Sequence, residues 1–242
     1  RRSKAEGGDM TITFTQDIPE TAAKTPRLPL PVPVRFGLVG GDGKAVPFRL
    51  SADGALADEH VILVNGKTHM QQIFAGGIDD VVPSLLRQFS APVRLDDDLS
   101  EAERLHLVAY DGDMFNRWDS VQTLISKMIV AIASGSAKAD NRFISTLAQA
   151  ISLNLADSKL LEQFKAGLLS LPSIPVLESR IQPADPVDLF QARAAFEVAL
   201  GRLLTAEIST MLDPKRSKLM AGSAGGRARR TARCIVSIAR AP

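Results

Sequence analysis

Three histidines and one cysteine are the side chains in this sequence with the clearest capacity for metal binding or nucleophilic chemistry. His60 and His69 flank a stretch that reads as a β-hairpin, so they could meet across two strands, but no third ligand of suitable type accompanies them. His106 stands alone, and no HExxH pair with i, i+4 spacing is present. We therefore expect surface or half-buried histidines rather than a zinc site.

The sequence also offers little support for nucleophilic or phosphate-binding chemistry. Cys234 has no histidine nearby, which favours an inert thiol. The stretch "VGGDGK" (39–44) lacks the following helix whose N-terminus would bind a phosphate. Neither "SGS" (134–136) nor "SAGG" (223–226) sits in the strand–turn–helix context of a nucleophile elbow. We assign no catalytic, metal-binding or cofactor-binding residue to this chain.

Composition places the chain among globular proteins. Its 242 residues, 45% hydrophobic and 23% charged, suffice for one large domain or two smaller ones. Its single cysteine excludes an intramolecular disulfide. Apolar runs fall far short of the roughly 20 residues that cross a bilayer, and no signal core is present, so we expect a cytoplasmic protein without membrane contact. The absence of an initiator Met before Arg1 suggests an excised fragment or removal of a tag.

The net charge of +2 is unevenly distributed. Residues 213–242 hold eight Lys or Arg against Asp213 alone, a net +7 that leaves −5 for residues 1–212. Such a tail could bind nucleic acid through counterion release. Its low apolar content and lack of aromatic stacking residues favour instead a disordered or non-native segment, so we expect no nucleic-acid partner.

The first 95 residues show the pattern of a β-sandwich. Residues 10–16 alternate apolar and polar side chains, as a half-buried strand does. Residues 40–43 (Gly-Gly-Asp-Gly) and Asn65-Gly66 are placed to form the turns of two hairpins. We predict an antiparallel, Ig-like β-sandwich over residues 1–97.

The stretch "VVPSLLRQFSAPVRL" (81–95) combines apolar residues with two prolines and two arginines. Arg87 and Arg94 alternate with apolar neighbours, which predicts that they point outward from the sandwich or pair with the acidic run 96–98. We interpret this stretch as the joint between the sandwich and a second type of architecture, not as a ligand site.

From residue 98 onward the hydrophobic period becomes helical. Ser100 and Glu103 form a capping box, and Asp185-Pro186 is an N-cap followed by proline at the first helical position. Phe115 and Trp118 share one helix face and are expected to anchor helices to each other or to the sandwich, although Arg117 could stack on Trp118. We predict an all-α, solenoid-like region of helical pairs over residues 98–212.

The segment 185–211 is predicted to be the longest helix of the chain. Its apolar residues include Leu189, Phe190, Ala194, Phe196, Val198, Leu200, Leu203 and Leu204. They cover so much of the cylinder that we expect neighbours on more than one side, and hence either self-association or a tail that folds back over the helix.

Five blocks resemble, in order, the C-terminal half of the bacterial aminopeptidase N family, whose members are zinc metallopeptidases that remove N-terminal residues from peptides. The blocks are "LPLPVPVRFGLVGGDGKAVPFRL", "VPSLLRQFSAPVRLDDDLS", "DMFNRWDSVQTL", "LLSLPSIPVLES" and "DPVDLFQARAAFEVAL". The resemblance covers roughly residues 10–211 and fades after Asp213-Pro214. In that family a small β-sandwich follows the catalytic domain, and a large helical domain closes over the active site.

The resemblance implies that this chain is a non-catalytic portion of such an enzyme. The sandwich would act as a spacer, and the helices, forming an incomplete domain, would help to wall off the active site. The family's zinc motif lies upstream of anything present here, so zinc is expected in the parent enzyme and no cofactor in this chain. The expected partners are the upstream catalytic domain of the same polypeptide and the parent's peptide substrates.

A second hypothesis stays open from the sequence. The sandwich and helices could form an independent protein-interaction module to which the basic tail adds an anchor. The upstream reading frame discriminates between the two hypotheses, because an HExxH-containing domain encoded before Arg1 supports the first and a start codon near Arg1 supports the second.

Overall fold

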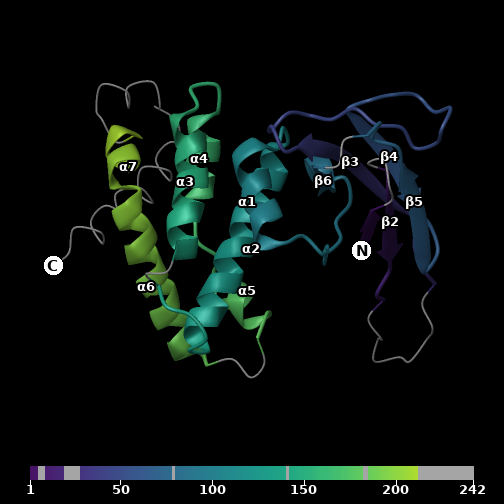
Figure 1. Ribbon diagram of the computed structural model, residues 1–242. Coiled ribbons are helices and arrows are strands. Elements are labelled where there is room, and N and C mark those ends of the chain that lie inside the picture. Colours follow the sequence, from purple (N-terminus) through teal and green to yellow (C-terminus); the bar gives the residue numbers. More distant parts are fainter. Residues whose placement is uncertain (5–8, 19–27, 78–79, 140–141, 182–184, 212–242) are drawn as a thin grey trace. The chain divides into compact units, whose positions relative to one another are not determined.

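The computed structural model describes residues 1–4, 9–18, 28–77, 80–139, 142–181 and 185–211 (Figure 1). The chain divides into two compact units, Arg1–Arg117 and Trp118–Pro242. The division falls inside one helix, α2 (Met114–Ala133). The basic segment 213–242, predicted to be disordered or non-native, lies outside the described residues.

The first unit contains two three-stranded antiparallel sheets. One sheet has the order β1-β2-β5, from β1 (Arg2–Lys4), β2 (Met10–Thr15) and β5 (Thr68–Ile73). The other has the order β4-β3-β6, from β4 (Glu59–Val64), β3 (Val32–Gly40) and β6 (Val81–Leu85). We call them sheet A and sheet B. Their alternating strand patterns arise because successive side chains point to opposite faces of a strand.

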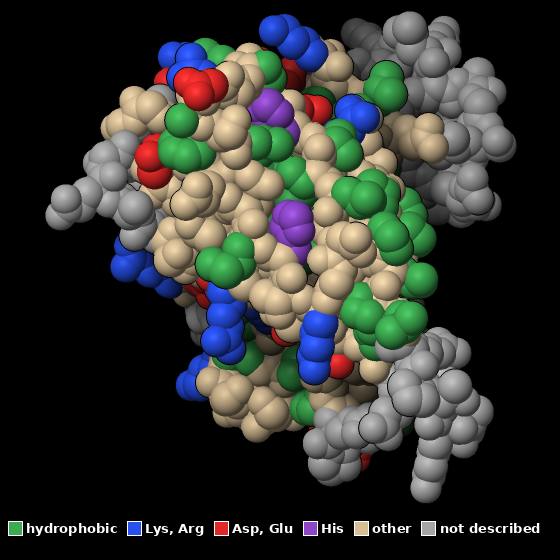
Figure 2. Space-filling model, turned by 90° about the vertical axis from the view of Figure 1, so that its right-hand side faces the viewer, with side chains coloured by type: hydrophobic (Ala, Val, Ile, Leu, Met, Phe, Trp, Pro, Cys, Tyr) green, Lys and Arg blue, Asp and Glu red, His purple; other side chains and the backbone are tan. Residues whose placement is uncertain are grey.

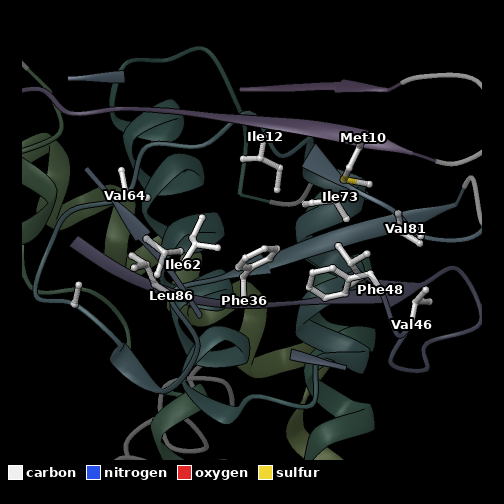
Figure 3. Close-up of a cluster of buried hydrophobic side chains, with 14 residues drawn as sticks. Met10, Ile12, Phe36, Val46, Phe48, Ile62, Val64, Ile73, Val81 and Leu86 are labelled. Atoms are coloured by element: carbon white, nitrogen blue, oxygen red, sulfur yellow. The ribbon is translucent and has the colours of Figure 1, made fainter. Parts of the chain in front are cut away.

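The core of this unit lies between the two sheets. Met10, Ile12 and Ile73 from sheet A point toward Phe36 and Phe48 on the other side (Figure 3). The rings of Phe36 and Phe48 are 5.1 Å apart, and neither side chain is exposed. The pattern of an Ig-like sandwich predicted from the sequence is thus confirmed.

One predicted hairpin turn is present and the other joins different sheets. Gly40 N donates to Lys44 O at 2.8 Å and Gly43 has a φ of 80°, as the first turn requires. Gly66 also has a φ of 80°, but the strands that it connects, β4 and β5, pair with β3 and β2 respectively. The expected hairpin around Asn65-Gly66 was wrong. A turn at glycine allows the chain to change direction, but it does not determine which strands pair with each other.

The first unit ends in a short 3₁₀ helix and the first α-helices. The 3₁₀ helix η1 spans Arg87–Phe89, and α1 spans Glu101–Tyr110. The predicted capping box is confirmed, since Ser100 and Glu103 exchange side-chain to backbone hydrogen bonds. Leu107 of α1 packs on Val39 and Val82 of sheet B.

The second unit is helical throughout its described elements. After α2 follow α3 (Arg142–Ala156), α4 (Glu162–Leu168), α5 (Ile174–Glu178), α6 (Pro186–Leu203) and α7 (Thr205–Met211). Helix α6 lies against α3 and α5 (Figure 1). Asp185 caps α6 as predicted, its carboxylate accepting from Val187 N at 2.8 Å.

The segment predicted as the longest helix is divided. Leu204, with φ −103° and ψ 13°, separates α6 from α7, so α2 with 20 residues is longer than α6 with 18. Phe196 and Leu200, which the sequence placed in an extended apolar area, are buried, whereas Phe190 and Leu203 are exposed. No helix in the described part of the chain is long and apolar enough to cross a membrane.

Candidate functional site: a buried arginine network

The backbone around Arg87 is held in an unusual conformation. Leu86, Gln88 and Phe89 have φ values of 56°, 56° and 53°, and they are the non-glycine residues of the described chain with positive φ. Such conformations cost on the order of 1–3 kcal/mol each and persist where the surroundings fix them. The contacts of Arg87 and of its neighbours provide that constraint.

The Arg87 guanidinium is buried and bonded on three sides. Its Nη1 lies 2.8 Å from Glu59 Oε1, its Nη2 lies 2.9 Å from Asp111 Oδ1, and its Nε donates to Ser84 Oγ at 2.8 Å. A buried charge requires such pairing because it has lost its hydration. Arg87 does point outward from the sandwich, since it lies over Gly37 on the outer face of sheet B, but it is buried there and its acidic partners are Glu59 and Asp111, not residues 96–98. Arg94, by contrast, is exposed.

Asp111 follows α1 and has no exposed side-chain surface. Burial, the largest influence, raises the pKa of its carboxyl group, and the opposite charge of Arg87 acts against that rise. Its Oδ1 also accepts from Asp113 N at 3.0 Å. Asp111 therefore links the end of α1 to the start of α2 through the same carboxylate that binds Arg87.

The first turn of α2 fixes the rest of η1. Asn116 Nδ2 donates to Ser84 Oγ at 2.7 Å and to Leu85 O at 2.8 Å. Asp113 accepts from Asn116 N at 2.9 Å, as an N-cap does, and from Gln88 N at 3.0 Å. The strained backbone of η1 is thus bonded to both ends of the connection between α1 and α2.

Gly37 on β3 provides the space for the arginine. A Cβ atom at this position would lie 2.4 Å from Arg87 Nη1 and 2.5 Å from Arg87 Cζ. Since Arg87 is held by three partners, moving its guanidinium aside would break these contacts. The glycine is therefore required by close approach of a side chain rather than by backbone conformation.

A second group of charges joins the N-terminal strand to α1. Arg2 Nε lies 2.8 Å from Asp98 Oδ1, and Arg2 also contacts Glu103, while Arg104 pairs with Asp97. The hydrogen bond from Arg2 lowers the pKa of Glu103 to about 2. Burial acts to raise the pKa of Asp98, but hydrogen bonds from Arg2 outweigh it and the net direction is downward. Two residues of the acidic run 96–98 are thus paired, Asp98 with Arg2 and Asp97 with Arg104.

The histidines lie apart and contact different groups. His60 Nε2 is 2.9 Å from Phe48 O, whereas His106 Nε2 is 2.8 Å from Gly40 O. His69 lies in sheet A opposite Phe14, so it does not meet His60 across a hairpin. The histidine side chains visible on the face drawn in Figure 2 are likewise separated by other groups. Within the described ranges, no three His, Cys, Asp or Glu side chains gather in a metal-binding group.

The two aromatic residues of α2, Phe115 and Trp118, differ in their contacts and exposure. Phe115 packs against Phe89 with ring centroids 5.3 Å apart, which confirms an anchoring role for Phe115 at η1. Trp118, for which the sequence predicted the same anchoring role, keeps 36% of its surface exposed. Arg117 donates to the backbone carbonyl of Asp111. Cys234 lies outside the described residues.

This arrangement is suited to holding elements together rather than to reaction. Both acidic groups beside Arg87 are paired with it, Glu59 through Oε1 and Asp111 through Oδ1. Sequence reasoning missed Ser84, Glu59 and Asp111 as its partners, and it missed Asn116, which bonds to Ser84. The available signal was an arginine within an apolar stretch, which predicts an acidic partner elsewhere in the chain but does not identify it.

Two family profiles match the chain. One, described as "Domain of unknown function (DUF3458) Ig-like fold", matches residues 2–98, and the other, described as "Domain of unknown function (DUF3458_C) ARM repeats", matches residues 101–239. The second alone covers more than half of the chain. The chain belongs to the DUF3458 family. The Ig-like and helical-repeat fold class predicted from the sequence is confirmed by both matches. The ARM-repeat match also extends over residues 212–239, which lie outside the described ranges.

The DUF3458 chain is homologous to the C-terminal region of aminopeptidase N, as the resemblance indicated. It is 34% identical over 189 residues to aminopeptidase N of Caulobacter vibrioides, which covers 76% of this chain and 21% of the relative. It is 27% identical over 203 residues to aminopeptidase N of Escherichia coli, with 82% and 22% covered. The chain thus spans about a fifth of the length of these curated relatives.

A solved structure shares the fold. A crystal structure of Legionella pneumophila aminopeptidase A in complex with aspartic acid matches with a TM-score of 0.75 at 20% identity. The match covers 98% of the DUF3458 chain and 27% of the other. The order of an Ig-like domain and a helical region is therefore shared with an aminopeptidase structure.

Proposed function

We propose that this chain is a non-catalytic C-terminal portion of a zinc-dependent aminopeptidase N. Its sandwich acts as a spacer, and its helices help to wall off the active site of the parent enzyme, which removes N-terminal residues from peptides. The observation that carries the proposal is the homology: most of this chain aligns with about a fifth of each aminopeptidase N relative. In this proposal the partners are the catalytic domain of the same polypeptide and the peptide substrates of the parent, in the cytoplasm.

The buried network supports the role of a spacer. A spacer holds the domains on either side of it at a fixed distance and orientation, so the connections between its own elements have to be rigid. Arg87 of η1 is buried and forms two ion pairs. The pair with Glu59, at 2.8 Å, joins η1 to β4, and the pair with buried Asp111, at 2.9 Å, joins η1 to the end of α1. Paired charges that are largely buried favour one geometry over others, and here Arg87 and Asp111 are the buried pair.

The zinc of the proposed parent does not fit the residues described here. A catalytic zinc needs three protein ligands and an open position. The side chains of His60 and His106 each bond to a backbone carbonyl in a different part of the first unit. The proposal accordingly assigns the metal and the chemistry to the catalytic domain.

A hybrid enzyme tests the proposal. In it, the segment of the C. vibrioides aminopeptidase N that matches this chain is replaced by the corresponding segment of this chain. We expect the hybrid to fold and to hydrolyse alanine p-nitroanilide and short peptides. A hybrid that folds but lacks this activity, or that does not fold, would contradict the proposal, with the unaltered C. vibrioides enzyme as the control.

A further inference from the structure

The outer faces of the two sheets differ in chemistry. In sheet A, the side chains that point away from the core come from cross-strand pairs such as Thr11–Gln72 and Thr15–Thr68, a polar face suited to water. In sheet B, the outward positions of β3, β4 and β6 are largely apolar, and include Val39, Val82, Val61 and Leu63. An antiparallel sheet that is apolar on both faces indicates that both faces are covered in the working protein.

One half of the outer face of sheet B is covered by the chain itself. Val39 and Val82 are cross-strand partners, and Leu107 of α1 packs on them. Val39 and Val82 keep only 1% and 5% of their surface exposed. Next to them, the Arg87 guanidinium lies over Gly37. A helix and a buried arginine therefore form the cover on the side of β6.

Among the residues that the structure describes, none covers the other half of this face. It consists of the cross-strand pairs Pro33–Leu63 and Arg35–Val61, and we call these four residues the bare half. Val61 is 56% exposed and Leu63 is 55% exposed. Along β3 the outward residues pass from exposed Pro33 to buried Val39, so the cover ends part-way along a single strand.

The charges beside the bare half are arranged for a partner as well. Glu59 Oε1 lies 2.8 Å from Arg87 Nη1, and Glu59 Oε2 lies 3.7 Å from Arg35 Nη1. Arg35 is thus weakly paired, and its guanidinium has donors left for another acceptor. A matching surface would be apolar opposite Val61 and Leu63 and would carry a carboxylate or carbonyl oxygen opposite Arg35.

We propose that the bare half is a docking surface for the peptidase region of an aminopeptidase N-type polypeptide, an inference that rests on the proposed function. The match occupies only 21% and 22% of the C. vibrioides and E. coli enzymes, so nearly four fifths of such a polypeptide is available to cover it. The surface is continuous with the cover formed by α1 and Arg87. The buried network of the first unit thereby supports the surface through Glu59.

Cysteine accessibility tests this inference. Leu63→Cys is placed in the Cys234→Ser chain alone and in the C. vibrioides hybrid, and its modification by N-ethylmaleimide is followed by mass spectrometry. The matched control is Met70→Cys on the outer face of sheet A, where Met70 is 67% exposed. We expect modification at position 63 to be about tenfold slower or more in the hybrid than in the chain alone, because only an accessible thiol reacts, and modification at position 70 to be equally fast in both.

The outcomes separate the two proposals. An active hybrid in which the Leu63→Cys thiol reacts as fast as in the chain alone overturns the docking surface and leaves the proposed function standing. A hybrid without activity contradicts the proposed function and the docking surface with it. Protection of that thiol in the chain alone that grows with protein concentration, without protection in the hybrid, would assign the surface to a second copy of the chain and would also overturn the inference.

Discussion

Arg87 and Asp111, 24 residues apart in the chain, form an ion pair of 2.9 Å in which the side chains are 5% and 0% exposed. The pair connects the strained turn after β6 to the residue that ends α1. Its burial makes each partner dependent on the other, because an unpaired buried charge is much less stable than a solvated one.

Removing the carboxylate should therefore be costly. We expect Asp111→Ala to lower the free energy of unfolding by about 3–5 kcal/mol, the usual cost of leaving a buried charge without its partner. Urea unfolding followed by circular dichroism measures the loss. Arg94→Ala, on an exposed side chain of the same stretch, is the control and should change stability by less than about 0.5 kcal/mol. Equal stability of the two variants would show that the pair does not hold the joint.

The local parts of this structure could be predicted from the sequence and the long-range parts could not. The cap at Ser100 and the Asp185-Pro186 start of α6 each depend on residues within one helical turn, and both are confirmed. The partner of Arg87 is 24 residues away, and the partners of β4 and β5 lie in different sheets. Those pairings depend on how strands and helices pack, which a sequence pattern of a few residues does not contain.

A methyl group at Gly37 should disturb the same network. We expect Gly37→Ala to cost about 1–3 kcal/mol, the range typical of overpacking, because the new Cβ would occupy the position of the Arg87 guanidinium. In an Arg87→Ala, Asp111→Asn background the same change should cost much less, since the obstruction is gone. A double-mutant cycle on unfolding free energies measures the difference. Equal costs in both backgrounds would contradict the assignment of Gly37 as the space for Arg87.

Acid should weaken the contact between the N-terminal strand and α1. The pKa of Glu103 is lowered from 4.5 to about 2, so its contribution to stability is complete above pH 4.5 and is lost as the pH falls toward 2. Since Glu103 is about a quarter exposed, the contribution is about 1 kcal/mol after allowance for solvent screening. Glu103→Gln should be less stable than the wild type at pH 7, and the difference should shrink toward pH 2. Glu101→Gln, on an exposed residue of the same turn, should not show this dependence.

The exposed side of α6 should promote self-association. Val187, Phe190 and Leu203 are 61%, 64% and 47% exposed. We expect sedimentation across a concentration series to show association, and Phe190→Glu to weaken it by about tenfold or more, equivalent to ~1.4 kcal/mol. Phe196→Glu is unsuitable as a probe because Phe196 is fully buried and a charge there would unfold the helices. A chain that stays monomeric at all concentrations would contradict this expectation.

We propose that this chain has no catalytic function of its own and contributes architecture to an aminopeptidase. The most direct measurement is hydrolysis of alanine p-nitroanilide by the purified chain in the presence of zinc, together with elemental analysis of the protein after dialysis. We expect no turnover above the uncatalysed rate and no stoichiometric zinc, since a catalytic zinc requires three ligands around an open position. Turnover that scales with the concentration of the chain, survives repurification and accompanies one bound zinc per molecule would contradict it.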